Sequence, residues 1–542
     1  MRWIALLVVV APVATPAIAA DPIRYTVTVE DGGSAPSLLV EIAFAGDRDG
    51  STTIELPSKW AGSEALHTHL TELAVTGGKL LGAADPARRV VRHRSGAPLL
   101  LRYRVRDAQA GLPEARSYEK ARPVVERDWF YAHGEGIFAI PQGRERSPAR
   151  FRWGRRPRGW RVASDLDVAD PAILTANDAA GAILTGGTAL RVTDRQVGGR
   201  RVLLAALGRW AFTDAELADR LARLIATENA MLSAPARPYV VTLAPLTGAE
   251  TGALSYGGSG RTAGFALAST ANVPLGDLTR LLAHEYAHRW FGEGEGWGPF
   301  ADGAADYWFT EGFNDWFASR AMVRSGLWTV ADWRAATDMM LLRHAASTAR
   351  GLDDAQLSAQ FWTNPDAMQV QYDRGNLTAT LLDDALSRRG GALLATLAGM
   401  GARSGEGGVA RLDRLVGAGL LARARADAAA ALLPPATFGA CGTLRTAVQP
   451  AYDRGFTTTA DNVVATVRAG GPAWAAGVRP GLRFKRRTVV NPGDAARPYA
   501  AEFLDGNVLR RLSWLPEGEK RVTFQTLAGS AVDESACAAL IG

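Results

Sequence analysis

The sequence is poor in two residue types, with two cysteines and seven histidines among its 542 residues. So few cysteines exclude a disulfide-stapled scaffold, and a chain of this length can bury a large core without one. Cys441 and Cys537 both lie in the C-terminal quarter. One disulfide closing that region and two partly buried free thiols are both compatible with this placement.

The sequence also lacks an apolar run of the roughly 20 residues that a membrane-spanning helix needs. The run from Ile4 to Ala11 is much shorter, follows Arg2 and precedes the small residues Ala17 to Ala19. This order is typical of a secretory signal peptide, which we predict over residues 1–20. No cysteine follows the cleavage site, so a lipoprotein anchor is not expected. We expect an exported protein, periplasmic or secreted, with no stable membrane insertion.

A strong excess of one charge is missing as well. The chain has 61 Lys and Arg against 55 Asp and Glu, a net charge of +6. Basic stretches such as Arg152 to Arg158 lie beside predicted strands and carry no nucleic-acid-binding motif. We interpret them as solvated surface and expect no nucleic-acid partner.

Length and patterning predict an α+β multidomain protein. Strand-like alternation runs through the residues after the signal peptide, as in Ile23 to Glu30. From about residue 276 apolar residues recur at helical spacing, and short strands return after Pro434. The predicted parts are a signal peptide over 1–20, a β-rich N-terminal domain over 21–230, a mainly helical domain over 231–435 and a C-terminal domain over 436–542.

The last of these parts contains Val467 to Ala473 followed by Ala476 to Gly481. This order resembles a PDZ domain, with a strand, a helix that starts at Pro-Ala and a Gly-x-x-Pro-Gly turn. Leu482 stands where that family commonly has an aspartate. The alternative is a generic turn-rich β segment, because glycine and proline suit tight turns in any such segment.

The most informative segment is His284-Glu285-Tyr286-Ala287-His288. On a helix, residues four apart lie on one face, so both imidazoles can bind one ion. Glu285 then flanks the metal, where it can accept a proton from water. The other five histidines (His67, His69, His93, His133 and His344) have no partner at this spacing. His67 and His69 alternate and could form a surface metal site, with ordinary loop histidines as the alternative.

A third metal ligand is expected downstream, in Trp308 to Phe313. Catalytic zinc commonly has two histidines, one carboxylate and an open position for water. Glu311 can supply the carboxylate, and Asp315, one turn later, can orient a histidine or simply lie on the helix surface. Glu293 and Glu295 are rival ligands, but they stand too close to His288 to match a ligand borne by a second helix.

HEYAHRWFG followed by WFTEGF resembles the glutamate-zincin (gluzincin) peptidases, including the aminopeptidase N and leukotriene A4 hydrolase family. The 22-residue spacer, 289–310, and the PDZ-like segment are more similar to the glycyl aminopeptidase family. The resemblance implies a thermolysin-like catalytic domain with one zinc ion. It also implies that Tyr372, in Gln371-Tyr372-Asp373-Arg374-Gly375, hydrogen-bonds the oxyanion; the alternative is a surface tyrosine.

The resemblance fails in one strand. The family has a glycine-rich stretch with a glutamate that binds the substrate's free amine. Here Gly257 and Gly258 are present, as close approach of substrate backbone requires, but Arg261 stands nearby and the glutamate is missing. Glu135 is a candidate amine anchor from the N-terminal domain, with a loop acid as the alternative.

These features predict a zinc metallopeptidase that cleaves peptide or protein substrates, with aminopeptidase action as the family default. The missing glutamate makes an endopeptidase or short-peptide hydrolase the alternative. A PDZ-mediated binding protein on a peptidase scaffold is the alternative from another class, and a non-peptidase zinc hydrolase is also compatible with the motif.

Overall fold

The fold is described from a computed structural model of the chain. It describes residues 21–30, 36–61, 63–107, 122–246, 254–292, 296–298, 306–401, 406–417, 419–430, 433–459, 461–489 and 493–541. The predicted signal peptide and the rival ligands Glu293 and Glu295 lie outside these residues.

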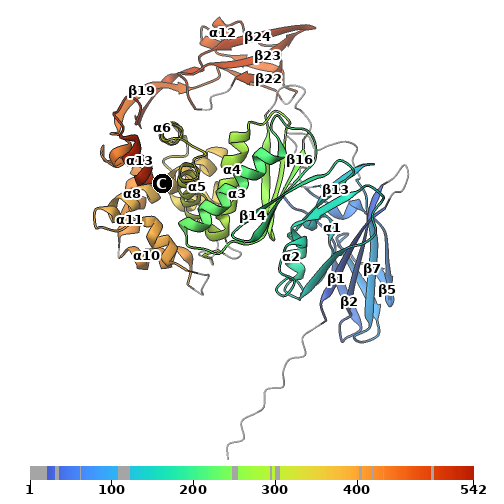
Figure 1. The fold of residues 1–542 in the computed structure, drawn as a ribbon. Helices are drawn as coiled ribbons and strands as arrows, with labels where there is room; N and C mark the ends of the chain where they lie inside the picture. Colours follow the sequence, from blue (N-terminus) through green and yellow to red (C-terminus); the bar gives the residue numbers. More distant parts are fainter. Residues whose placement is uncertain are drawn as a thin grey trace, which may run out of the picture.

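The N-terminal part is built from three sheets around one core (Figure 1). Their strand orders are β11-β1-β2-β7-β4, β10-β3-β6-β5 and β12-β13-β9-β8. Alternate residues of β1, such as Tyr25 and Val27, are fully buried, as the period of two predicted. The strands and short helices of this part are β1 (Ile23–Glu30), β2 (Ser37–Ala45), β3 (Ser51–Glu55), η1 (Leu66–His69), β4 (Leu70–Thr76), β5 (Gly78–Gly82), β6 (Arg88–His93), β7 (Pro98–Val105), β8 (Val124–Val125), β9 (Trp129–His133), α1 (Gly134–Ile137), β10 (Ile140–Pro141), β11 (Ala149–Trp153), β12 (Arg161–Ser164), η2 (Asp165–Asp167), α2 (Ala176–Ala180) and β13 (Ile183–Gly187).

A fourth sheet, of order β14-β15-β16-β18-β17, starts the part that carries the candidate site. Its strands are β14 (Arg191–Val197), β15 (Arg200–Ala206), β16 (Tyr239–Pro245), β17 (Tyr256–Arg261) and β18 (Gly264–Ser269). Strands β15, β16 and β18 run parallel, whereas β14 and β17 are antiparallel edges. The sequence placed residues 191–230 in the N-terminal domain, but β15 pairs with β16. Alternation predicts that a segment is a strand without saying which sheet it joins.

Helices complete this part and share one large core with the fourth sheet. Helix α4 buries Leu278, Leu282 and Tyr286 at intervals of four, the face that its apolar spacing predicted. The helices are α3 (Asp214–Met231), α4 (Leu275–Phe291), the π-helix η4 (Trp308–Phe313), α5 (Asn314–Arg324), α6 (Val330–Ala346), α7 (Asp354–Gln360), α8 (Pro365–Ser387), α9 (Leu393–Gly399), α10 (Gly408–Val416) and α11 (Leu420–Ala430).

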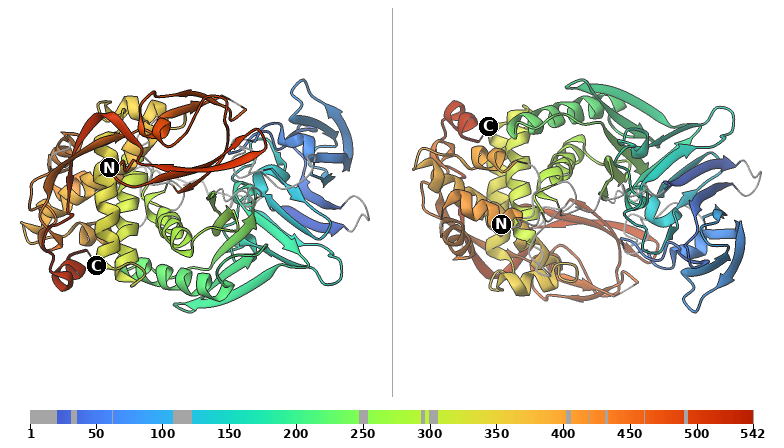
Figure 2. Two further views of the ribbon diagram at one scale, coloured as in Figure 1. Left: turned by 90° about the horizontal axis from the view of Figure 1, so that it is seen from above. Right: turned by 90° about the horizontal axis from the view of Figure 1, so that it is seen from below.

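The C-terminal segment forms a small separate unit and then returns to the helices (Figure 2). Phe456, Phe484, Phe503 and Trp514 are among the buried residues of its own core. The PDZ-like interpretation of this unit stays a prediction. Its elements are η5 (Gly439–Cys441), β19 (Arg445–Tyr452), β20 (Phe456–Thr458), β21 (Val464–Val467), α12 (Pro472–Ala475), β22 (Arg483–Val489), β23 (Tyr499–Asp505), β24 (Val508–Trp514), β25 (Glu517–Thr526) and α13 (Glu534–Ile541).

The two ends of this segment belong to the helical core rather than to the small unit. Cys441, Leu444, Leu527 and Cys537 all lie in the cluster that also holds the residues of α4 and α5. A disulfide joins Cys441 to Cys537, with an S–S distance of 2.05 Å and a sequence separation of 96. The small unit is therefore inserted between two segments that are covalently linked to each other.

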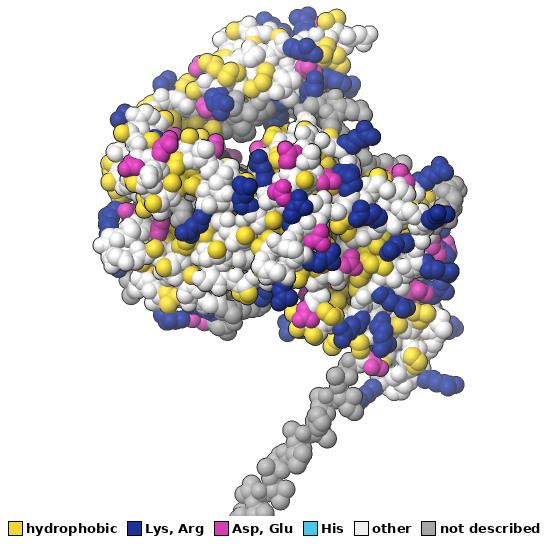
Figure 3. Space-filling view, viewed as in Figure 1, with side chains coloured by type: hydrophobic (Ala, Val, Ile, Leu, Met, Phe, Trp, Pro, Cys, Tyr) yellow, Lys and Arg dark blue, Asp and Glu magenta, His cyan; other side chains and the backbone are white. Residues whose placement is uncertain are grey.

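Within the described residues, no helix is long and apolar enough to span a bilayer. On the face drawn in Figure 3, basic side chains lie among acidic ones over the N-terminal sheets and the fourth sheet. This mixed distribution matches the near balance of charge in the sequence.

Candidate metal centre and adjoining cavity

Helix α4 presents two imidazoles on one face. His284 and His288 are one turn apart, and their Nε2 atoms lie 3.1 Å from each other. Both rings are packed among neighbouring elements, and His284 is buried. The helical spacing therefore produces the paired nitrogens that the sequence predicted.

The π-helix η4 carries the third candidate ligand. Glu311 Oε2 lies 3.2 Å from His284 Nε2 and 3.6 Å from His288 Nε2. A π-helical turn is rare and is frequently found at functional sites, because it shifts the side chains that follow it around the helix axis. The sequence pattern indicated a second helix here but contained no signal for its π-helical start.

These three side chains fit a tetrahedral zinc ion. An ion about 2.0–2.1 Å from each ligand keeps neighbouring ligand atoms roughly 3.3 Å apart. The three separations observed, 3.1, 3.2 and 3.6 Å, match that value. In the described part of the chain, they form the one group of three or more His, Cys, Asp or Glu side chains that could hold a metal ion.

Asp315 orients the ring of His284 through the nitrogen that faces away from the other two candidate ligands. Its Oδ1 lies 2.8 Å from His284 Nδ1, which leaves Nε2 facing the other two ligands. Arg280 holds the second carboxylate oxygen of Asp315 at 3.0 Å. Asn314 donates a hydrogen bond of 2.9 Å to the carbonyl of His284, which joins α4 to α5.

The ionisation of the ligands follows from this network. Burial disfavours a charged His284, but hydrogen bonds with Asp315 and Glu311 outweigh it and raise the pKa of His284 to about 10. Burial lowers the pKa of His288 to about 4. Without a metal, His284 is therefore positively charged at neutral pH and His288 is neutral.

Glu285 lies beside these side chains on α4 and is partly buried. Burial raises its pKa to about 7; the charge of His284 opposes this rise, whereas Glu311 and Asp315 add to it. A carboxylate with a pKa near neutrality can both accept and return a proton.

Helix α8 places Tyr372 over the same centre. Its ring stacks on that of His284 with centroids 5.7 Å apart, and its hydroxyl hydrogen-bonds Glu311. Two glycines permit this approach: a Cβ on Gly375 would lie 1.8 Å from the carbonyl oxygen of Trp308 and 2.7 Å from the Cα of Gly312. Arg374 points elsewhere, donating to the carbonyls of residues 350 and 352.

The other histidines do not join this site. His93 hydrogen-bonds Thr52, His69 contacts the carbonyl of Arg106, and His133 is buried between the rings of Trp60 and Tyr131. His67 lies on η1 and His344 on α6. The alternation of His67 and His69 therefore does not produce a metal site among the described residues.

The glycine-rich stretch that contains Gly257 and Gly258 forms the edge strand β17, which contacts α4. A Cβ at Gly257 would meet nothing within 4 Å, so this position leaves open space beside the strand. A Cβ at Gly258 would lie 2.2 Å from the carbonyl oxygen of Ala266. Packing against β18 therefore accounts for Gly258, while the space at Gly257 remains compatible with substrate backbone.

Glu135, the candidate anchor for a substrate amine, forms an ion pair with Arg261 of β17. Arg261 Nη1 lies 2.8 and 2.7 Å from the two carboxylate oxygens of Glu135, and its guanidinium stacks over Trp60 at 4.4 Å. The side chain of Arg261 is only 4% exposed. The negative charge of Glu135 is therefore already paired within the protein.

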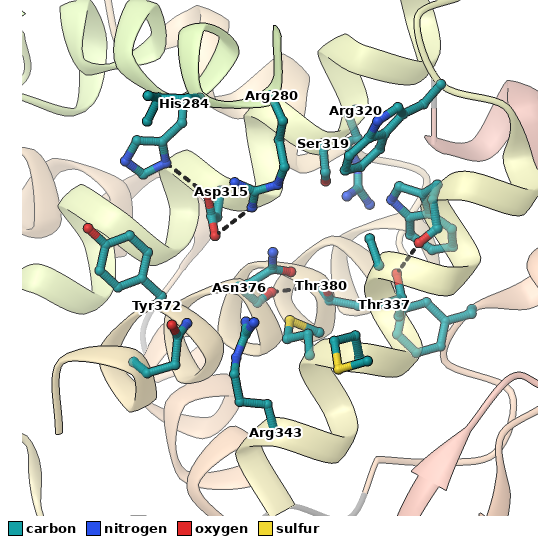
Figure 4. A pocket seen from close by; sticks show the side chains of 18 of the residues that line it. Arg280, His284, Asp315, Ser319, Arg320, Thr337, Arg343, Tyr372, Asn376 and Thr380 are labelled. Atoms are coloured by element: carbon teal, nitrogen blue, oxygen red, sulfur yellow. Dashed lines mark hydrogen bonds and ion pairs between the residues drawn. The ribbon is translucent and has the colours of Figure 1, made fainter. Parts of the chain in front are cut away.

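A cavity of about 390 Å³ adjoins the candidate metal centre (Figure 4). It lies between α4, α5, α6 and α8, and both Glu285 and Tyr372 line it. Three arginines from different helices, Arg280, Arg320 and Arg343, also line it. The sequence contains no signal for this group of arginines, because 63 positions separate Arg280 from Arg343 and no motif joins them.

No protein-family model matches the sequence, and no curated protein is similar to it. Among solved structures, an aminopeptidase N family protein from Idiomarina loihiensis matches 96% of this chain and 100% of its own, with a TM-score of 0.68 at 14% identity. An M1 zinc metallopeptidase from Deinococcus radiodurans matches 77% of this chain and 95% of its own, with a TM-score of 0.43 at 16% identity. By the first of these matches, the chain has the fold of an aminopeptidase N family protein, which confirms the broader resemblance at the level of the fold; the greater similarity to the glycyl aminopeptidase family stays a prediction.

Proposed function

We propose that the chain is a zinc-dependent metallopeptidase, with His284, His288 and Glu311 as the ligands of one ion. The observation that carries this proposal is the convergence of their three ligand atoms beside Glu285. A protein that used zinc only for stability would have no need for a partly buried carboxylate beside the three ligands.

Each residue has a defined part in the proposed reaction. A zinc ion held there supplies positive charge that polarises the scissile carbonyl and acidifies water. Glu285 accepts a proton from the attacking water and returns it to the leaving amine. Asp315 keeps His284 in the ring orientation and tautomer that bind the metal.

Tyr372 stabilises the oxyanion in this proposal. Its hydroxyl hydrogen-bonds Glu311 in this structure, and we infer that it donates to the carbonyl oxygen once substrate is bound. The stacking of its ring on His284 supports this role over that of a surface tyrosine.

The fold supports aminopeptidase action as the first expectation, whereas one observation favours an endopeptidase or short-peptide hydrolase. The carboxylate of Glu135 is occupied by Arg261, and the amine-binding glutamate is absent from β17. A substrate ammonium group would have to displace a charged, largely buried guanidinium to reach Glu135.

Cleavage of matched peptides tests both the activity and its direction. Protein starting at Asp21 is incubated with peptides that carry a free or an acetylated N-terminus, and products are identified by mass spectrometry. Removal of single residues from free peptides only would identify an aminopeptidase. Internal cuts in both forms would identify an endopeptidase.

The control is Glu285→Gln, which removes the proton acceptor at nearly constant volume. We expect kcat to fall by about 10²–10⁴-fold, with zinc content unchanged by elemental analysis. Full activity in this variant would overturn the mechanism, and failure of the unaltered zinc-loaded protein to cleave any peptide would overturn the proposed function.

We further propose export to the periplasm or the medium. The signal-peptide pattern at residues 1–20 supports it, as does the disulfide between Cys441 and Cys537, because disulfides persist in oxidising compartments. We retain the PDZ-like unit as a proposed peptide-binding module, which would add an extended peptide strand to its sheet.

A further inference from the structure

The cavity beside the candidate metal centre is lined by apolar, basic and acidic side chains together. Trp328, Trp333, Met340 and Phe438 are among the apolar side chains, and the cavity's volume of about 390 Å³ is that of a small-molecule site. The polar lining includes arginines, carboxylates and side-chain amides. This combination suits a short peptide fragment with an apolar body and a charged end.

Two of the arginines are held from one side while the rest of each guanidinium faces the cavity. Arg280 contacts Asp315 through Nη2 at 3.0 Å, and its side chain is 42% exposed. Arg343 contacts Asp373 through Nε at 3.0 Å and through Nη2, and its side chain is 37% exposed. Asp373 is only 1% exposed and does not line the cavity.

The two guanidinium groups come from opposite sides of the cavity. Figure 4 shows Arg280 reaching in from α4 and Arg343 from α6, with Asn376 of α8 beside Arg343. Charged donors fixed by carboxylates are preorganised, and the guanidinium fork matches the two oxygens of a carboxylate. Glu285 and Asp315 also line the cavity, but the three arginines outnumber them, so the lining still favours an anionic group over an amide near Arg343.

The chemistry of cleavage decides which part of a peptide enters. Glu285 lines the cavity, and in the proposed function it returns a proton to the leaving amine. The segment after the scissile bond must therefore start next to Glu285. Arg261 and Glu135, at the other end of the expected binding strand, do not line the cavity.

We infer that this cavity binds the leaving fragment of the substrate through a carboxylate held by Arg280 and Arg343, which makes the enzyme selective for peptides with a carboxylate shortly after the scissile bond. The inference rests on the proposed peptidase function. The carboxylate is either the C-terminus of a short peptide or an acidic side chain.

Three matched peptides test the inference on the unaltered zinc-loaded protein. They share one sequence before the scissile bond and end in alanine, alaninamide or aspartic acid amide. Loss of the carboxylate is expected to lower kcat/KM by about tenfold or more, the effect of one charge-assisted hydrogen bond. Recovery with the aspartic acid amide would assign an acidic side chain as the carboxylate, and failure to recover would assign the C-terminus.

Equal kcat/KM for the acid and both amides would overturn the inference and leave the proposed function intact. No cleavage of any peptide by zinc-loaded protein would instead count against the proposed function, and therefore against this inference as well.

A paired variant tests the residues. Arg343→Met combined with Asp373→Asn removes the guanidinium without leaving a buried, unpaired carboxylate. We expect it to lose the preference for the free acid, so that its kcat/KM values for the free-acid and alaninamide peptides lie within threefold of each other. Arg388→Gln is the matched control, because that arginine pairs with Asp384 on α8, is 62% exposed and does not line the cavity. An unchanged preference in a folded double variant would rule out Arg343.

Discussion

At the scale of single residues, Tyr372 shows how one side chain completes a site built by others. It contacts the ring of His284 and the carboxylate of Glu311, and it lines the cavity that we assign to the leaving fragment. Its burial and the neighbouring carboxylates raise the pKa of its hydroxyl far above the usual value, which keeps the proton on the oxygen in the metal-free protein.

Replacing Tyr372 with Phe removes that donor and keeps the ring. We expect kcat to fall by about 10²–10³-fold, the usual effect of losing one oxyanion donor. Zinc content and KM should change little, because the ring still packs against His284. Steady-state kinetics on one peptide measures this, and a kcat within threefold of the parent value would contradict the role of the hydroxyl.

Proton release on zinc binding is the second prediction at this scale. The pKa of His284 is about 10 without metal and that of His288 is about 4, so between pH 6 and pH 8 His288 is neutral, whereas His284 holds one extra proton. Zinc must displace it, so apparent zinc affinity should rise roughly tenfold for each pH unit. Chelator competition at pH 6, 7 and 8 measures this slope.

Asp315→Asn is the matched variant for that experiment. It removes the carboxylate that keeps His284 protonated, so the slope should flatten while overall zinc affinity falls by about 10–100-fold. A parent protein whose zinc affinity is independent of pH over this range would contradict the assigned charge of His284.

At the scale of elements, the site depends on a close crossing of η4 and α8. Gly312 and Gly375 meet backbone to backbone, and this contact sets the distance between Glu311 on one element and Tyr372 on the other. A glycine in a helix interior costs stability, so its presence at both positions indicates that close packing is required there.

Gly375→Ala should push α8 away from η4, because its new Cβ would lie 1.8 Å from the carbonyl oxygen of Trp308. We expect a loss of about 1–3 kcal/mol in the free energy of unfolding, together with a large fall in kcat as Tyr372 moves. Gly399→Ala is the control, because a Cβ there meets nothing within 4 Å. Equal thermal stability of the two variants would show that the crossing tolerates a side chain.

At the scale of the whole molecule, long-range links hold the parts around the site. The ion pair between Glu135 and Arg261 joins the N-terminal sheets to β17 across 126 positions of sequence. The disulfide joins α13 to η5, and α13 also packs against α5, which carries Asp315. The C-terminal helix therefore belongs to the framework of the candidate site.

Removing the disulfide should weaken this framework without removing the chemistry. Cys441→Ala with Cys537→Ala opens a loop of 96 residues, and such a cross-link typically contributes about 2–5 kcal/mol. Guanidinium unfolding should show that loss, and reduced parent protein should behave like the double variant. An unfolding midpoint equal to that of the oxidised parent would contradict a stabilising role.

The sequence by itself determined what depends on neighbours along the chain. The four-residue spacing of His284 and His288 specifies a shared helical face, and alternation specifies which side of a strand such as β1 is buried. Glu311 is selected because zinc needs a carboxylate ligand downstream of the two histidines, and Tyr372 is selected through the family resemblance of its segment. These patterns predicted the α+β class and the content of the candidate metal centre.

Only the tertiary structure decided what depends on contacts between distant segments. Because β15 pairs with β16, residues 191–230 belong to the part that carries the candidate site. Both ends of the C-terminal segment pack in the core of the helices. Three arginines from different helices line one cavity, and Arg261 forms an ion pair with Glu135. Local periodicity determines which faces of an element are exposed and which are buried. Its partners are determined by strand pairing and packing, and neither of these leaves a signal within a few residues of sequence.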